Sequence, residues 1–516
     1  MNLNILKLFK KEEVIEATPM PAQKKKQNTG SQRSFRGAAY GRFTNWLFSS
    51  FTKVNADLKS DLQKLVVRCR DLAKNNEIFR SHLNNIEKSI VGQQGFRLQS
   101  LVKENGELQE TINAELENAW WDFGKRSNGY ITEDGEMGDK DLDALILRTL
   151  LIDGEVFIRI NKNAKNPYGI SFSLIDSLSL DSTRNEDFSF NKNAIVMGIE
   201  IDRNYRPVKY HFREGTLDTY QSGKEIIIDA SEIIHIYKKE FIGQVRGFPE
   251  ICASLDSLKQ LDDYGIAELM AAKVAACQNI FYERTGAVGG DWLDQNSSNY
   301  EEKGTFIREL SPGESSIVPQ GYTVKSVSPN HPNTNYGGFV KAIVRRIASS
   351  VGVSYNRLSH DYESVSYSSL REASVDEGKT YATIQRFIIE NWKELEYKLF
   401  VISYIINNTS TKLKPSKVNE YLNFQFIPRR DDLFDPAKDV IAVERKLKLG
   451  LTNPIIELER RGLDVDDVLD GWKVWERKCK DRELIFTNDQ PLPLDIMDEI
   501  AQSENHPEQI DEEKDK

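Results

Sequence analysis

Two predicted helical rods separated by an inserted segment constrain this fold more than any other feature. Residues 242–249, IGQVRGFP, lead into the first rod. The second rod ends in residues 352–361, GVSYNRLSHD, and a third helix is predicted to begin near Tyr367. Two rods, an insert and a polar loop are typical of a structural protein and not of an enzyme. The layout therefore predicts a protein that works through assembly and not through an active site.

Length and composition set the class of protein. The 516 residues suffice for roughly three or four domains of ~100–200 residues. No stretch approaches the ~18 uninterrupted apolar residues of a membrane span. The N-terminus lacks the apolar region and cleavage site of a secretory signal, so we expect none. The four cysteines show no paired spacing, which argues against a zinc ribbon or disulfide framework and fits a reducing cytoplasm.

Charge is distributed unevenly along the chain, whose net charge is −10. Residues 1–36 carry eight basic and three acidic side chains, whereas residues 487–516 carry ten acids and two lysines. These ends are either two solvated tails, or a basic arm for an acidic partner and an acidic tail for a basic one. The body between them remains acidic, which argues against tight, static binding of DNA.

Periodicity predicts the order of elements. Helical spacing covers residues 55–91, 108–121 and 141–151. Short β-branched and aromatic runs predict strands over residues 155–160, 170–174, 195–201, 208–212, 226–228 and 233–237, with a turn over 202–207. The first rod follows Pro249. Residues 278–335 are rich in Gly, Ser, Asn and Pro and predict a small mixed module.

The second rod is amphipathic, with Lys341, Arg345 and Arg346 on its basic side. The third helix is predicted over residues 368–408. Further helices begin at Pro436 and Pro454, each with the proline at the first helical position.

No catalytic constellation is present in the sequence. Residues 377–380, EGKT, end like a phosphate loop, but Ala373 stands where that motif needs a glycine. The six histidines are never within four residues of one another. Adjacent acids at 262–263, 431–432 and 466–467 could suggest a two-metal nuclease. Neighbouring helical residues point ~100° apart, however, so solvated faces and helix caps explain these pairs better. We predict neither a catalytic residue, nor a metal, nor a cofactor.

Short motifs in a fixed order carry a resemblance. They lie at residues 70–76, 90–92, 153–157, 198–200, 206–208, 235, 243–249, 310–314, 347–348, 352–355, 358–362 and 367–371. In this order they resemble the lambda-type portal proteins of tailed bacteriophages, over residues 60–475. The chain departs from the family after Trp121, where a cysteine–aspartate pair is missing, and at Leu370, where a smaller residue is usual.

The resemblance implies an α+β portal fold. It consists of a mixed α/β wing, two long stem helices, a small α/β clip, a channel loop and a helical crown. The implied ranges are 1–52 for a basic mobile arm, 53–246 for the wing, 247–277 for stem helix 1, 278–335 for the clip, 336–351 for stem helix 2, 352–368 for the channel loop, 369–410 for a long wing and channel helix, 411–486 for the crown and 487–516 for an acidic disordered tail.

The resemblance also implies a function. Such proteins form a ring, usually of twelve copies, at the unique vertex of the capsid, where they connect head to tail. Double-stranded DNA is packaged through the ring by the terminase and later ejected. The implied partners are other copies of the chain, DNA, the terminase large subunit, a head–tail adaptor, and the major capsid and scaffolding proteins, with no membrane. The implied locations are the virion and, during assembly, the host cytoplasm.

Candidate DNA-facing residues follow from this expectation. An acidic ring would repel phosphates, and a few groups at defined levels would grip the duplex. The candidates are Arg357, His360, Asp361, Tyr362 and Tyr367. The alternative is that they are ordinary loop residues at a subunit contact. Lys341, Arg345 and Arg346 would either face the channel or, as we slightly favour, pair with acids on an adjacent stem.

Two other functions stay open at the level of sequence. One is a DNA-processing enzyme, specifically a metal-dependent nuclease that uses the carboxylate pairs. The other is a different structural protein of the virion, although such chains are typically shorter and lack the two rods.

Overall fold

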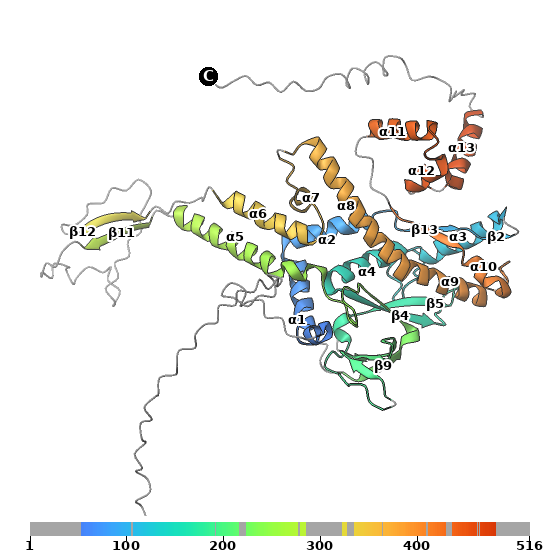
Figure 1. The fold of residues 1–516 in the computed structure, drawn as a ribbon, viewed down its shortest axis with the longest axis horizontal. Coiled ribbons are helices and arrows are strands. Elements are labelled where there is room, and N and C mark those ends of the chain that lie inside the picture. The colour runs from blue at the N-terminus through green and yellow to red at the C-terminus, as the bar shows by residue number, and fades with distance from the viewer. Residues whose placement is uncertain are drawn as a thin grey trace, which may run out of the picture. The chain divides into compact units, whose positions relative to one another are not determined.

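The computed structural model describes residues 53–104, 107–190, 192–215, 223–276, 279–284, 322–327, 335–363, 365–408, 411–429, 436–461, 463 and 465–480. These residues form a mixed helical and stranded fold (Figure 1). The predicted N-terminal arm, most of the predicted clip and the predicted acidic tail lie outside these ranges. None of the helices within them combines the length and apolar composition that a membrane span requires.

Four helices precede and flank the sheets: α1 Val54–Asn75, α2 Glu77–Ile90, α3 Glu110–Gly124 and α4 Asp139–Asp153. The helix predicted over residues 55–91 is therefore interrupted. Asn76 has an extended backbone and its side-chain oxygen accepts a hydrogen bond from the Phe79 amide at 2.8 Å, which caps α2. The Asn76 amide group also donates to Asp262 at 2.8 Å. One residue thus ends α1, starts α2 and ties both to the first rod.

The strands form two main antiparallel sheets. The first has the order β10-β4-β5 and the second the order β6-β7-β8-β9. Their bounds are β4 Glu155–Lys162, β5 Ile170–Ile175, β6 Ala194–Val196, β7 Ile199–Ile201, β8 Pro207–Arg213, β9 Glu225–Asp229 and β10 Ile233–Tyr237. Two short pairs, β2 Lys103–Glu104 with β3 Glu107–Leu108, and β11 Asn279–Arg284 with β12 Tyr322–Val327, are also antiparallel.

The predicted strand over residues 195–201 is in fact a hairpin. Met197 and Gly198 have φ values of 49° and 85°, and β6 pairs antiparallel with β7 on either side of them. Positive φ at both central residues gives a turn whose twist matches that of the flanking strands. The predicted turn over residues 202–207 is confirmed, because it joins the antiparallel strands β7 and β8.

The two rods are α5 Leu255–Ala276, which follows the short helix η4 Glu250–Ser254, and α6 Tyr336–Ser350. They pack along each other (Figure 1). Tyr264 of α5 stacks on Tyr336 and meets Phe339 edge-on, with ring centroids 5.5 and 5.1 Å apart. At the other end, the hydroxyls of Ser254 and Ser350 form a hydrogen bond.

The third helix is interrupted by one π-helical turn. It comprises α8 Tyr367–Ile388, the π-helical turn η5 Ile389–Lys393 and α9 Glu394–Asn407. A π-turn inserts one residue into the helical repeat, so the buried face rotates at that point. The turn buries Trp392 and Lys393 completely. Trp392 meets Phe172 of β5 edge-on at 5.1 Å, which anchors the helix on the first sheet.

The C-terminal part begins inside the same core. The short helices η6 Pro415–Lys417 and α10 Val418–Tyr421 lead to β13 Phe424–Ile427, which pairs antiparallel with β1 Arg97–Ser100. The range 411–486, expected to be a helical crown, therefore contains a strand that completes the N-terminal half. Helices follow it: α11 Pro436–Lys448, α12 Pro454–Arg460 and α13 Val465–Lys480.

Candidate functional site

Several of the short motifs meet at one set of buried and half-buried charged residues, which we call the junction: Arg70, Asp153, Glu155, Asp176, His235 and Arg246. In its first half, Arg70 of α1 donates to Asp153 at 2.8 and 2.5 Å and to Asp176 at 3.0 and 2.7 Å. The Ser177 hydroxyl donates to Asp153 at 2.7 Å. One guanidinium therefore joins α1 to the end of α4 and to the segment after β5.

In the second half, Arg246 of the segment before the first rod holds Glu155 at the start of β4. Its Nε lies 2.8 and 2.9 Å from the two carboxylate oxygens, and both residues are almost completely buried. Glu155 also accepts from the Gly247 amide at 3.0 Å and lies 3.1 Å from His235 Nε2. Burial opposes the ionised form of Glu155, but Arg246 and His235 outweigh it and lower the pKa of Glu155 to about 2.

Two glycines let the backbones cross beside these charges. Gly154 has φ +84°, and a Cβ there would lie 2.0 Å from the Phe248 carbonyl carbon. A Cβ on Gly247 would lie 2.1 Å from the Gly154 oxygen. Only glycine fits such a contact between main chains. The motif at 243–249 is therefore structural, since it fixes the base of the first rod against the corner between α4 and β4.

The predicted loop over residues 352–368 contains one short helix, α7 Tyr355–Ser359. Arg357 turns toward the protein: its guanidinium donates to Ser89 at 2.8 Å and to Glu377 at 3.3 Å, and lies over the Tyr381 ring. His360, whose φ is 54°, lies 3.1 Å from the Ser81 hydroxyl of α2. Both residues thus contact α2 of their own chain.

The other loop candidates divide into bound and exposed groups. Asp361 accepts from the Tyr355 hydroxyl at 2.8 Å and from Lys341 of α6 at 3.3 Å. The Tyr355 hydrogen bond and the Lys341 charge hold the pKa of Asp361 below its ordinary value. Tyr362 and Tyr367 are about half exposed, at 53% and 49%. Lys438 lies over the Tyr367 ring, 5.9 Å from its centroid.

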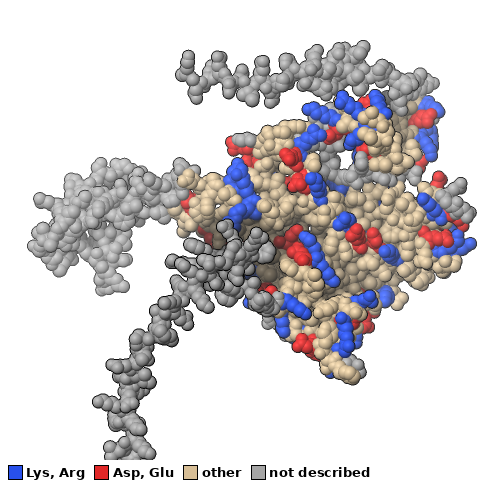
Figure 2. Space-filling view, viewed as in Figure 1, with Lys and Arg blue, Asp and Glu red and all other residues tan. Residues whose placement is uncertain are grey.

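Two of the three basic side chains on the second rod contact other residues of the same chain. Lys341 and Arg345 both lie over the Tyr355 ring, at 5.2 and 5.4 Å from its centroid. The structure thereby brings Lys341, Arg345 and Asp361 together around Tyr355. Arg346 is exposed on α6. Figure 2 shows Lys and Arg side chains gathered over α6, whereas the rest of the visible face mixes both signs.

Sequence reasoning missed a buried charge cluster around Lys393, which we call the lysine cluster: Asp139, Asp143, Lys393 and Glu396. Lys393 Nζ lies 2.6 Å from Asp139, 2.7 Å from Glu396 and 3.4 Å from Asp143. Trp392 donates its indole proton to Asp143 at 2.8 Å. The sequence signal was weak: Lys393 and Glu396 stand three residues apart on the predicted third helix, beside the aromatic residues Trp392 and Tyr397.

Burial and the mutual charges of its four members shift the pKa values in the lysine cluster. Burial disfavours the charge on Lys393, but Asp139, Asp143 and Glu396 raise its pKa above the ordinary value. Burial raises the pKa of Asp143 to about 7 and that of Glu396 well above its ordinary value. The three carboxylates have the spacing of metal ligands, but the ammonium group already occupies their centre. Lys393 therefore forms buried ion pairs with these carboxylates, and the raised pKa values of Asp143 and Glu396 favour their protonated forms.

We expect Arg357→Ala to lower the free energy of unfolding by about 1–3 kcal/mol, because it removes hydrogen bonds to Ser89 and to the buried Glu377. Urea unfolding of the unassembled chain measures the change. The control is His360→Ala, whose exposed side chain should cost less than about 1 kcal/mol. If Arg357→Ala unfolds at the wild-type midpoint, Arg357 does not anchor the loop.

Comparisons with known proteins agree with one another. A family model described as "Phage portal protein, lambda family" matches residues 40–385. A probable portal protein of Halomonas phage phiHAP-1 is 30% identical over 469 residues, which cover 88% of each chain. Portal protein B of Escherichia phage lambda is 21% identical over 468 residues, 83% of this chain and 86% of the relative.

Solved structures of gene transfer agent particles are also similar. A chain of the native virion matches with a TM-score of 0.42 and 12% identity, covering 79% of this chain and 94% of that one. A chain of the neck of the empty particle, computed with C6 symmetry, matches with a TM-score of 0.43 and 14% identity, covering 78% and 94%.

Proposed function

This chain belongs to the lambda family of phage portal proteins, and from that membership we propose that it closes into a ring-shaped conduit for double-stranded DNA at the unique capsid vertex. The resemblance inferred from the motifs is thereby confirmed. Portal proteins are structural components of the virion rather than enzymes. The finer points, which are the ring, the passage of DNA and the partners, are proposals.

Exposed apolar side chains on the first rod carry the proposal of a ring. Ile266, Leu269 and Met270 of α5 are 61%, 56% and 57% exposed. Three large apolar side chains within five residues of one rod form an apolar surface whose exposure to water is unfavourable. A neighbouring subunit would cover this surface. Phe339 of α6, at 51%, adds to the same pair of rods. Repeating one such contact around an axis closes a ring.

The DNA path in this proposal runs past the loop and the second rod. The exposed members of the candidate set are the groups we propose to contact the duplex: Arg345, Arg346, His360, Tyr362 and Tyr367. The half-buried members, Lys341, Arg357 and Asp361, would position them. An overall charge of −10 per chain would keep the duplex from adhering elsewhere on the ring.

Each proposed partner is assigned to one part of the conduit. The clip would bind the packaging terminase and later a head–tail adaptor, and the wing would face the major capsid and scaffolding proteins. The protein would assemble in the host cytoplasm and remain in the virion. Twelve copies is the proposed ring size.

The described residues do not favour a nuclease. Asp262 accepts the Asn76 hydrogen bond, and Asp263 pairs with Lys259 at 2.9 Å. The side chains of the acid pairs at 431–432 and 466–467 lie outside the described part of the chain. We therefore propose no second function.

Negative-stain microscopy of the purified chain tests the ring, and we expect closed particles with a central hole. The paired variant Ile266→Asp with Leu269→Asp should prevent closure, because each ring contact would then bury unpaired carboxylates. Phe190→Asp, which alters a side chain that is 89% exposed away from the rods, is the matched control and should assemble. A wild-type chain that stays a compact monomer under all assembly conditions would refute the proposal.

A further inference from the structure

A groove of about 710 Å³ lies between α3, α4 and the β1–β13 pair. Its apolar lining comes from Phe96, Leu98, Trp120, Trp121, Ile427 and Leu463. Trp121 is 65% exposed although tryptophan is the largest apolar side chain. The volume falls in the range of ~300–1,000 Å³ that is typical of ligand and peptide sites.

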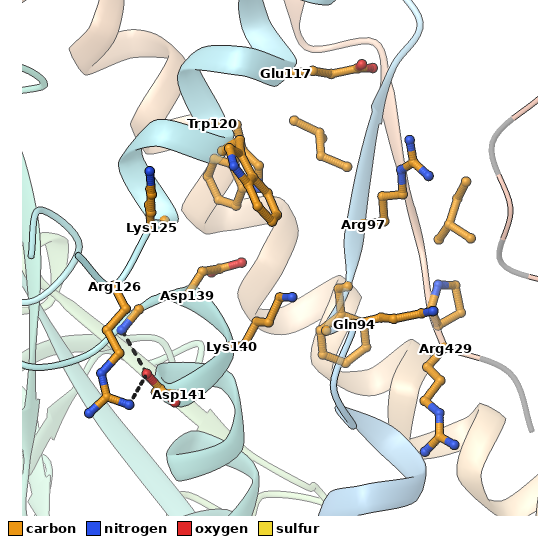
Figure 3. A pocket seen from close by; sticks show the side chains of 18 of the residues that line it. Gln94, Arg97, Glu117, Trp120, Lys125, Arg126, Asp139, Lys140, Asp141 and Arg429 are labelled. Carbon is orange, nitrogen blue, oxygen red and sulfur yellow. Dashed lines mark hydrogen bonds and ion pairs between the residues drawn. The ribbon is translucent and has the colours of Figure 1, made fainter. Parts of the chain in front are cut away.

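Cations line opposite walls of this groove (Figure 3). Lys125 and Arg126 follow α3 on one wall with Lys140 of α4, while Arg97 of β1 and Arg429, two residues after β13, lie on the other. These five cations exceed the three lining acids, Glu117, Asp139 and Asp141.

Each of these acids already has a partner. Glu117 accepts from the Ser100 amide at 2.7 Å, Asp139 pairs with Lys393 at 2.6 Å, and Asp141 pairs with Arg126 at 3.4 Å. Lys140 lies over the Trp121 ring at 5.6 Å. The groove therefore presents an apolar floor and a surplus of positive charge, which fits an acidic peptide with apolar side chains.

We propose that residues 492–500 of the chain's own acidic C-terminal tail bind in this groove. Their sequence, LPLDIMDEI, has three carboxylates between large apolar residues, whereas residues 501–516 are almost entirely polar. Leu494, Ile496 and Met497 would contact the tryptophans and Leu98. Asp495, Asp498 and Glu499 would face the basic walls.

The chain length permits this binding within one copy. Leu463, which lines the groove, comes two residues before α13, and the 16 residues of that helix extend ~24 Å. Residues 481–491 can span up to ~40 Å, enough to return from the far end of the helix. Tethering gives the segment an effective concentration on the order of millimolar, so modest contacts suffice for occupancy. This inference does not depend on the ring.

Photocrosslinking in the full-length chain tests the proposal. With p-benzoylphenylalanine in place of Ile496, irradiation should join the tail to peptides containing residues 93–98, 117–126, 138–141 or 427–429. Trp121→Ser combined with Lys125→Glu should reduce this yield roughly tenfold, because it removes the exposed aromatic anchor and reverses one wall charge. Both side chains are exposed, so the fold should persist.

Lys162→Glu, a charge reversal at an exposed lysine distant in sequence from the groove, is the matched control and should leave the yield unchanged. Raising the salt concentration to 0.5 M should also lower the wild-type yield, since exposed charge pairs are screened. Crosslinks scattered over other surfaces, or groove crosslinks indifferent to the paired variant, would overturn the proposal. So would crosslinks that join chains of different isotopic label when the two are mixed.

Discussion

Arg246→Ala should lower the free energy of unfolding by about 3–5 kcal/mol, because it leaves the carboxylate of Glu155 buried without its counter-charge. Glu155 is fully buried, and the guanidinium supplies its closest contacts. His235 remains beside the carboxylate, but burial lowers the pKa of His235 and favours its neutral form. Urea unfolding of the unassembled chain, followed by far-ultraviolet circular dichroism, measures the change.

A matched control separates burial from simple loss of an ion pair. Lys238→Ala removes an exposed pair with Glu240, so it should cost no more than about 1 kcal/mol. Combining Arg246→Ala with Glu155→Gln should recover part of the loss, because the stranded charge is then gone. Equal midpoints for Arg246→Ala and the wild type would show that the junction contributes nothing to stability.

Raising the pH from about 4 to 7 should remove roughly 3 kcal/mol of stability through Asp143. Its pKa is raised from 3.8 to about 7, so over this interval the folded chain keeps a proton that the unfolded chain has lost. Because the folded chain binds more protons than the unfolded chain in this range, its free energy of unfolding falls as the pH rises. The pKa of Asp143 is raised because its side chain is buried and because the carboxylate of Asp139 lies nearby.

The measurement is the difference in unfolding free energy between the wild type and Asp143→Asn across pH 4–8. Other groups titrate in the same range: the lowered pKa values of Glu155 and His82, about 2 and 4, make the folded chain lose stability on acidification. The difference between the two proteins cancels these contributions. Asp376→Asn, at a carboxylate that is 84% exposed, should show no such slope. A pH-independent difference for Asp143→Asn would contradict the protonated state.

Local periodicity gave the elements correctly because it depends on residues close in sequence. The second rod buries Val344, Ile347 and Ala348 and exposes Arg345 and Arg346, as its apolar spacing indicates. The predicted strands lie close to their observed bounds for the same reason, except that the strand predicted over residues 195–201 is the β6–β7 hairpin. The break at Asn76 was missed because one capping residue can divide a helix without changing the apolar repeat.

Pairings across the chain could not be predicted in this way. Arg70, Glu155 and Arg246 each stand in a recognisable motif, yet Arg246 and Glu155 are 91 residues apart and only folding brings them together. Arg357 was a candidate for an outward role, but its partners on α2 and α8 are set by packing. Lys393 reached the core through the rotation of the π-turn, which the helical period does not show.

The pairing of β1 with β13 has a consequence for biosynthesis. Strand β1 is made early, but residues 101–423 must leave the ribosome before its partner exists. At ~5–20 residues per second this takes roughly 15 s to 1 min, during which the edge of β1 stays unsatisfied. An unpaired strand edge can associate with other chains, so we expect the yield of folded protein in a host to rise with chaperone supply.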